Sequence, residues 1–170
     1  MDFEKVLLSR KSCRQYLDKA VEADKLEKVV IAGSLAPIGQ PKMGAPALSV
    51  VTDKEMLKTL GYLMAPAVDI DICYGAPALI VVSCPPASPG IADQNAACVV
   101  EMMSLMATSL GLGNIYLYGV AAALQKNEEL MKKLSIPENY TPLAALALGY
   151  GTEEVSVCKE MVNKLQVFNI

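Results

Sequence analysis

The longest apolar stretch of the chain lies between Ile91 and Gly113 and predicts a helix of about six turns. Small or polar side chains recur in it every three or four positions and form one narrow stripe: Gln94, Ala97, Glu101, Ser104 and Thr108. Because most of the remaining circumference is apolar, this helix must be buried on most sides. We expect it to pack on a sheet on one side and on a second copy of the chain on the other. A core helix within a monomer is the alternative.

The rest of the pattern alternates between helical and extended periods. Helices are expected from Phe3 to Leu7, over 23–35, from the cap Asp53 through Leu60 and over 128–134, and strands over 47–52, 77–83, 114–118 and 143–149. The apolar run at 77–83 indicates a strand buried on both faces. Gly111 and Gly113 are expected to end the central helix, and Gly119 to end the strand before it. Mixed elements with clustered strands predict an α+β fold in one domain, residues 1–170.

Composition narrows the function classes. Apolar residues make up 53% and charged residues 19% of the 170 positions, which is typical of a globular protein. A net charge of −3 argues against nucleic acid as the main partner. Asp93, Gln94, Asn95 and Glu101 would be costly in lipid, so the central helix is not expected to span a membrane. Five scattered cysteines and no signal-peptide pattern favour reduced thiols in a cytoplasmic protein.

The sequence contains no histidine. This excludes Ser–His and Cys–His nucleophiles and most metal sites, so we expect no metal. A bound organic cofactor is the natural carrier of any chemistry, because it needs position and charge from the protein.

A basic cluster follows the first predicted helix: Arg10, Lys11, Ser12 and Arg14. It can be interpreted in two ways. Cations at a helix C-terminus complement the helix dipole. Alternatively, two guanidinium groups and a hydroxyl form a pocket for a phosphate. The spacing leaves both open.

Several stretches, in order, resemble one family, the FMN-dependent nitroreductases. They are Ser9–Tyr16 (SRKSCRQY), Leu26–Val30 leading to Ala36-Pro37, Val50–Asp53, Tyr74–Pro77, Leu110–Gly113 and Leu146–Tyr150. The resemblance covers about residues 3 to 151. It implies a central, mostly antiparallel sheet flanked by helices, with the long buried helix at a homodimer interface and two FMN sites shared between the subunits.

The resemblance also implies roles for particular positions. Arg10, Lys11, Ser12 and Arg14 would hold the FMN phosphate and ribityl chain. Pro37, Ile38, Gly39 and Gln40, contributed from the partner subunit, would lie along the flavin ring. Leu117, Tyr118 and Gly119 would match the segment that runs beside this ring. Backbone N–H groups would face the flavin N5–O4 edge, so no catalytic side chain is expected.

The chain departs from the family at two places. Gln40 or Pro41 stands where the family usually has asparagine in the flavin loop. Lys159 and Lys164 are the only candidates for the C-terminal basic pair that grips the phosphate in many members.

The sequence thus predicts an oxidoreductase that passes hydride from NAD(P)H through FMN to a nitroaromatic, quinone or other small acceptor. The alternative is a dimer that binds flavin or another planar ligand without turnover. A third hypothesis is a purely structural dimer, for which the central helix is the only support.

Overall fold

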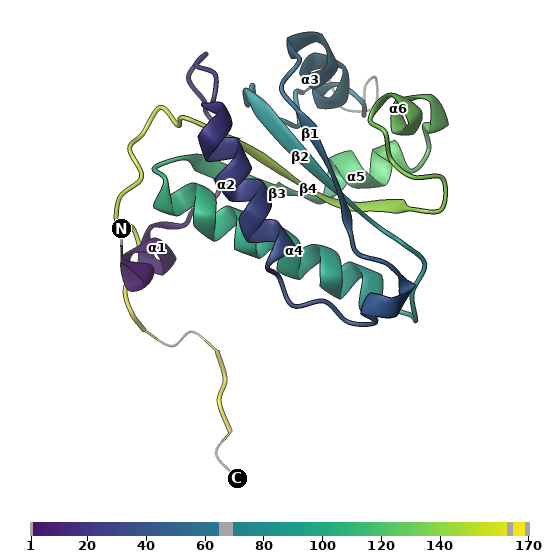
Figure 1. The fold of residues 1–170 in the computed structure, drawn as a ribbon. Coiled ribbons are helices and arrows are strands. Elements are labelled where there is room, and N and C mark those ends of the chain that lie inside the picture. The colour runs from purple at the N-terminus through teal and green to yellow at the C-terminus, as the bar shows by residue number, and fades with distance from the viewer. Residues whose placement is uncertain (1, 65–69, 163–164, 169–170) are drawn as a thin grey trace.

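A four-stranded antiparallel sheet forms the centre of the molecule (Figure 1). The computed structural model describes residues 2–64, 70–162 and 165–168. In spatial order the strands are β1 (Ala47–Val51), β2 (Ala78–Cys84), β4 (Thr141–Gly149) and β3 (Gly113–Leu117). Each neighbouring pair is antiparallel. The predicted α+β fold with an antiparallel sheet is confirmed.

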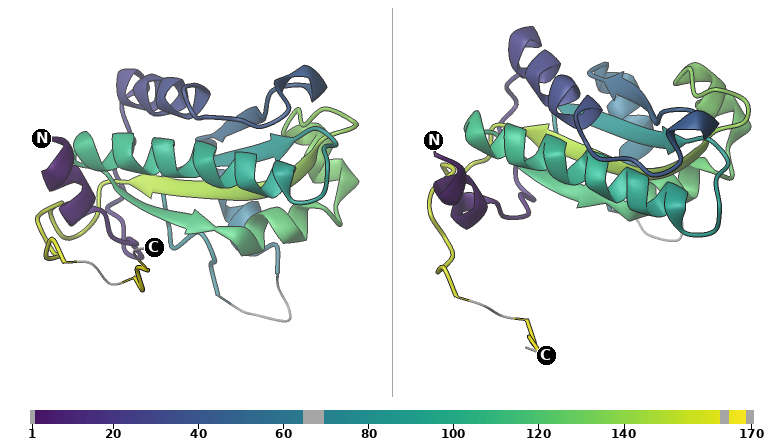
Figure 2. Two further views of the ribbon diagram at one scale, coloured as in Figure 1. Left: turned by 90° about the horizontal axis from the view of Figure 1, so that it is seen from below. Right: turned by 60° about the horizontal axis from the view of Figure 1, so that its bottom comes forward.

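Helices cover both faces of the sheet, and the sheet separates the hydrophobic core into two halves (Figure 2). Bounds of the helices are α1 (Phe3–Ser9), α2 (Ala23–Ser34), α3 (Lys54–Gly61), α4 (Ile91–Ser109), α5 (Tyr118–Leu124) and α6 (Glu128–Lys133). Residues of α2 and α4 pack with one face of β2, represented by Ile80 and Val82. Residues of α3, α5 and α6 pack with the other face, represented by Leu79 and Val81. Every residue of β2 is buried, as its nearly uninterrupted apolar run predicts.

The close approach of α2 to α4 depends on a glycine. A Cβ at Gly33 would lie 2.8 Å from Cγ of Met103, so only glycine leaves the room that the buried Met103 side chain needs. Helix α4 in turn packs on β2, β3 and β4. It is the helix that connects α2 to the sheet.

The stripe of small and polar residues on α4 does not share one environment. Ser104 and Thr108 are buried, whereas Gln94, Ala97 and Glu101 are exposed within this chain. The expectation that α4 packs on a sheet is confirmed. The hydroxyls of Ser104 and Thr108 form hydrogen bonds within the chain.

Three details of the element boundaries differ from the sequence prediction. Gly111 has φ +76° and ends α4 as expected, but Gly113 is the first residue of β3. Gly119 does not break a strand, since Tyr118 and Gly119 begin α5, a helix that the alternation of apolar residues did not predict. Between the helix expected over 23–35 and the strand expected over 47–52, where no element is predicted, the chain forms a short 3-10 turn, Pro41–Met43.

The described part of the chain after Thr152 forms no helix or strand. Six large apolar side chains are exposed in it: Val157, Met161, Val162, Leu165, Val167 and Phe168. Among the described residues, none of the helices is both long and apolar enough to cross a membrane.

Candidate functional site

The basic segment after α1 is fixed along the end of the sheet. Cys13 N donates to Asn114 O at 2.9 Å, and the backbones of Tyr16 and Gly151 pair in an isolated antiparallel β-bridge. Burial raises the pKa of Tyr16, so its hydroxyl stays protonated and donates to Cys13 O at 3.1 Å. A Cβ at Gly113 would lie 2.7 Å from the Cys13 sulfur, which explains why β3 begins with glycine where the segment lies against it.

Asn114 ties this segment to the C-terminal end of α4. Its side chain, with 2% of the residue exposed, accepts from Ser104 Oγ at 2.7 Å and donates to Thr108 Oγ1 at 3.1 Å. Its backbone oxygen accepts from Cys13, as described above. A buried and satisfied polar network rigidifies its surroundings. The network therefore sets the position of the basic segment relative to α4.

We expect Asn114→Ala to lower the free energy of unfolding by about 1–3 kcal/mol, because it leaves the Ser104 hydroxyl buried without its acceptor. Urea unfolding measures this. Adding Ser104→Ala to that variant is expected to cost little more, since the two residues share one network. Fully additive losses would contradict the shared network.

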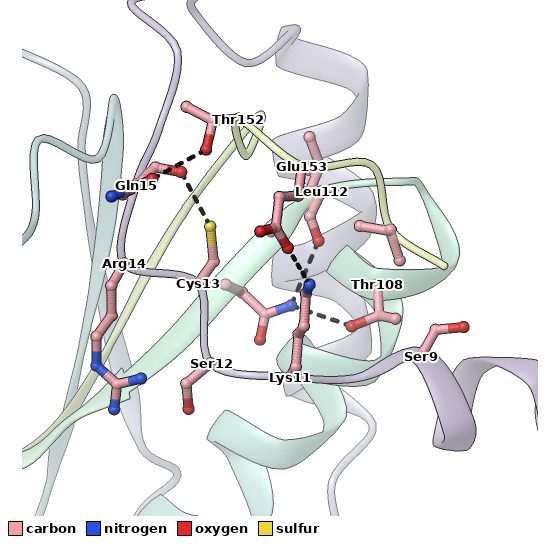
Figure 3. A pocket seen from close by; sticks show the side chains of 13 residues that line it. Ser9, Lys11, Ser12, Cys13, Arg14, Gln15, Thr108, Leu112, Thr152 and Glu153 are labelled. Carbon is pink, nitrogen blue, oxygen red and sulfur yellow. Dashed lines mark hydrogen bonds and ion pairs between the residues drawn. The ribbon is translucent and has the colours of Figure 1, made fainter. Parts of the chain in front are cut away.

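A cavity of about 350 Å³ lies beside the basic segment (Figure 3). Its lining includes Lys11, Ser12 and Arg14, together with Ser9 and Glu153. The Ser9 hydroxyl is buried, with 2% of the residue exposed, and has no hydrogen-bond partner in the described structure. The cavity thus combines two cationic side chains with hydroxyl groups, one of which is unsatisfied.

The cationic side chains of this cavity have different partners. Lys11 Nζ lies 2.5 Å from Glu153 Oε2, while the Arg14 guanidinium lies 5.9 Å from the centre of the Tyr74 ring. In Figure 3, Lys11 extends towards Glu153, and Ser12 and Arg14 extend to the opposite side of the segment. The hydrogen bond raises the pKa of Lys11 and lowers the pKa of Glu153, so both groups are charged near neutral pH.

Arg10 is placed differently from the rest of the cluster. It is the C-cap residue of α1, its N–H donates to Val6 O, and it does not line the cavity. Arg10 therefore stands at the helix end, as the capping interpretation expects. Lys11, Ser12 and Arg14 line the cavity, as the phosphate interpretation expects.

The loop from Pro37 to Gln40 lies at the other end of α4. Gly39 N donates to Asn95 Oδ1 at 2.7 Å, and Asn95 Nδ2 donates back to Gly39 O at 3.0 Å. Gln40 exchanges hydrogen bonds with Ser88, at 2.7 and 3.1 Å. Asn95 precedes the cavity residue Thr108 by thirteen positions, which is about 20 Å along a helix. One chain therefore does not bring this loop to the basic segment.

The third predicted segment joins β3 to α5. Leu117 is buried, whereas Tyr118 is 67% exposed. Gly119 lies beside Met64, whose sulfur would be 3.4 Å from a Cβ at that position. The first N–H groups of a helix have no acceptor within it, so Tyr118 and Gly119 can donate to another group.

Sequence reasoning missed several residues that build this region. Glu153 and Thr152 come from the C-terminal segment, and Asn114 and Asn95 are buried amides that form hydrogen bonds within the chain. Asn114 had a signal, because it is a polar residue within an apolar run, whereas Asn95 directly follows the polar residues Asp93 and Gln94. Of the two lysines proposed for the phosphate, Lys159 donates to Leu7 O at 3.2 Å, and Lys164 lies outside the described residues.

Comparison with known proteins gives one consistent result. Residues 39–150 match the model of the nitroreductase family. A relative from Archaeoglobus fulgidus, whose assigned name is that of an NADH dehydrogenase/NAD(P)H nitroreductase, is 30% identical over 159 residues, 88% of this chain and 86% of its own. The crystal structure of a nitroreductase with bound FMN from Bacteroides fragilis superposes with a TM-score of 0.83 at 25% identity, covering 100% of this chain and 99% of the other.

A second FMN-bound nitroreductase structure, from Desulfitobacterium hafniense, gives a TM-score of 0.82 at 26% identity with the same coverage. The chain thus shares the α+β fold of these nitroreductases. This chain belongs to the nitroreductase family.

Proposed function

We propose that this chain is an FMN-dependent oxidoreductase that takes hydride from NAD(P)H and reduces a nitroaromatic, a quinone or another small acceptor. The observation that carries the proposal is the clamped basic segment beside β3, with its cavity lined by Lys11, Ser12 and Arg14. Relatives of similar length and fold are crystallised with FMN or carry NAD(P)H in their names.

The residues present fit a phosphate group. Ammonium, guanidinium and hydroxyl groups are the donors that phosphate oxygens favour. The unsatisfied Ser9 hydroxyl adds a buried donor to the same cavity. Arg10 adds a third cation close by, at the end of α1.

When bound, FMN supplies the hydride-transfer chemistry itself. The chain's own residues bind and orient. Lys11, Ser12 and Arg14, with Arg10, would hold the phosphate and ribityl end, and the N–H groups of Tyr118 and Gly119 would be free to donate to the flavin. Leu117 is buried and fixes the start of α5, which positions those two N–H groups. With no histidine in the chain, no Ser–His or Cys–His nucleophile takes part.

The proposed site needs two chains. The loop at Pro37–Gln40 lies at the start of α4 and the cavity lies at its end, so a second copy packed antiparallel along α4 would bring each loop to the other chain's basic segment. The side of α4 that carries Gln94, Ala97 and Glu101 is exposed in this chain and could form that contact.

Exposed apolar side chains support a second copy as the partner. Phe3, Ile31 and Leu35 are exposed on or next to the helices that lie on the α4 side of the sheet. The apolar side chains of the C-terminal segment, from Val157 to Phe168, are exposed as well. A homodimer would bury both sets.

A visible absorption titration tests the function. We expect purified protein to take up FMN and its flavin bands to bleach when NADH or NADPH is added without oxygen. Electrons should then pass to an added quinone. Flavin that binds and stays oxidised with both nucleotides would favour the alternative, a dimer that holds flavin without turnover. No uptake of FMN would overturn the proposal.

A further inference from the structure

Glu153 holds Lys11 by an ion pair within the proposed phosphate site. The two residues are 142 positions apart in sequence, and both line the cavity that Ser12 and Arg14 also line. The Lys11 side chain is 41% exposed and the Glu153 side chain is 77% exposed, so the pair lies at the solvent-facing side of the cavity.

The backbone brings Glu153 to this place. Thr152 N donates to Gln15 O at 3.2 Å, and Gly151 bridges Tyr16. A Cβ at Gly151 would lie 3.1 Å from the Cys13 sulfur, so a glycine allows the two segments to lie this close. The carboxylate of Glu153 is therefore held next to the basic segment by bonds that do not involve its own side chain.

The ion pair directs Lys11 away from the other two phosphate donors. Lys11 extends towards Glu153, while Ser12 and Arg14 extend to the other side of the segment (Figure 3). A phosphate that recruits Lys11 must take it from Glu153 and must also approach a carboxylate of like charge. Both effects oppose phosphate binding. They do not block it, because the exposed Glu153 carboxylate can turn into solvent once the phosphate arrives.

We propose that Glu153 competes with the ligand phosphate for Lys11 and thereby weakens the binding of phosphorylated flavin. This inference rests on the function proposed above and concerns the same site. Because exposed ion pairs are weak, Glu153 tunes the affinity for FMN and does not abolish it.

The test compares Glu153→Gln with Glu154→Gln, a neighbouring exposed glutamate whose replacement removes the same charge. FMN affinity is measured by quenching of flavin fluorescence at equilibrium, and riboflavin, which lacks the phosphate, is measured in parallel. We expect Glu153→Gln to tighten FMN binding about three- to tenfold. Glu154→Gln should leave it nearly unchanged, and neither variant should alter riboflavin binding.

Placing Glu153→Gln in a Lys11→Gln background separates a direct effect from one through Lys11, and the gain in FMN affinity should largely disappear there. Equal FMN affinities in Glu153→Gln and Glu154→Gln would overturn the inference and leave the proposed function intact. An equal gain for riboflavin would overturn it too, because the phosphate would not be involved. Failure of the wild-type chain and of every variant to bind FMN would overturn both.

Discussion

Replacing Gly149 by alanine is expected to lower the free energy of unfolding by about 2–3 kcal/mol. Gly149 is the buried last residue of β4 and pairs with Gly113 of β3. A Cβ there would lie 2.4 and 2.5 Å from two ring carbons of Pro77 and 3.2 Å from Tyr16. A proline ring cannot rotate away as a flexible side chain can, so β4 or the start of β2 must shift.

Urea unfolding and thermal melting measure this change, and a loss of that size corresponds to a fall in melting temperature of roughly 4–12 °C for a chain of this length. Gly119→Ala is the matched control with the opposite expected sign. Among the described residues, a Cβ at Gly119 would meet the Met64 sulfur at an ordinary 3.4 Å. Alanine also favours the helical conformation of α5 by about 1 kcal/mol. Equal stability of Gly149→Ala and wild type would contradict the steric account.

Much of the fold could be predicted because local pattern and burial agree. The apolar run of β2 is buried on both faces, and Asp53 caps α3 by accepting from Met56 N. The pattern fails where a glycine serves a long-range contact. Gly113 follows a helix-ending glycine in sequence, yet its lack of a side chain admits Cys13, from a segment a hundred positions away.

The start of α5 was missed for a related reason. Tyr118 and Gly119 are poor helix formers that follow a strand directly, and a short helix after them gives little periodicity to detect. Packing of Val120 and Leu124 against the sheet stabilises this helix. Tertiary burial thus overrides weak local preference.

The candidate site could be predicted as far as it is encoded in one continuous segment. Lys11, Ser12 and Arg14 stand together in sequence and line one cavity. Glu153 could not be predicted, because only the fold brings the C-terminal segment to Lys11. The separation of the Pro37–Gln40 loop from this cavity could not be predicted either, because it depends on which ends of α4 the two segments contact in the fold.

Replacing Arg14 by glutamate is expected to weaken FMN binding about 100-fold or more. Loss of a charge-assisted hydrogen bond costs about 1.5–3 kcal/mol, and the new carboxylate would repel the cofactor phosphate. Arg10 is the other arginine of the chain; it caps α1 and does not line the cavity, so we expect it to compensate little. Fluorescence titration with FMN measures the change. Lys132→Glu on α6 makes the same change in net charge on the opposite layer and should leave FMN affinity within about twofold.

Mixing two defective chains tests both this residue and the shared site. A Cβ at Gly39 would lie 3.2 Å from Cγ2 of Ile91, so Gly39→Val is expected to displace the Pro37–Gln40 loop. If that loop serves the proposed site, this variant should oxidise NADH poorly when present alone. In a mixed dimer with Arg14→Glu, one of the two sites would combine an intact basic segment with an intact loop. We therefore expect mixed samples, refolded together, to regain up to about a quarter of wild-type activity. Activity that stays at the level of the separate variants would contradict a site built from both chains, because the basic segment and the loop would then serve the same chain.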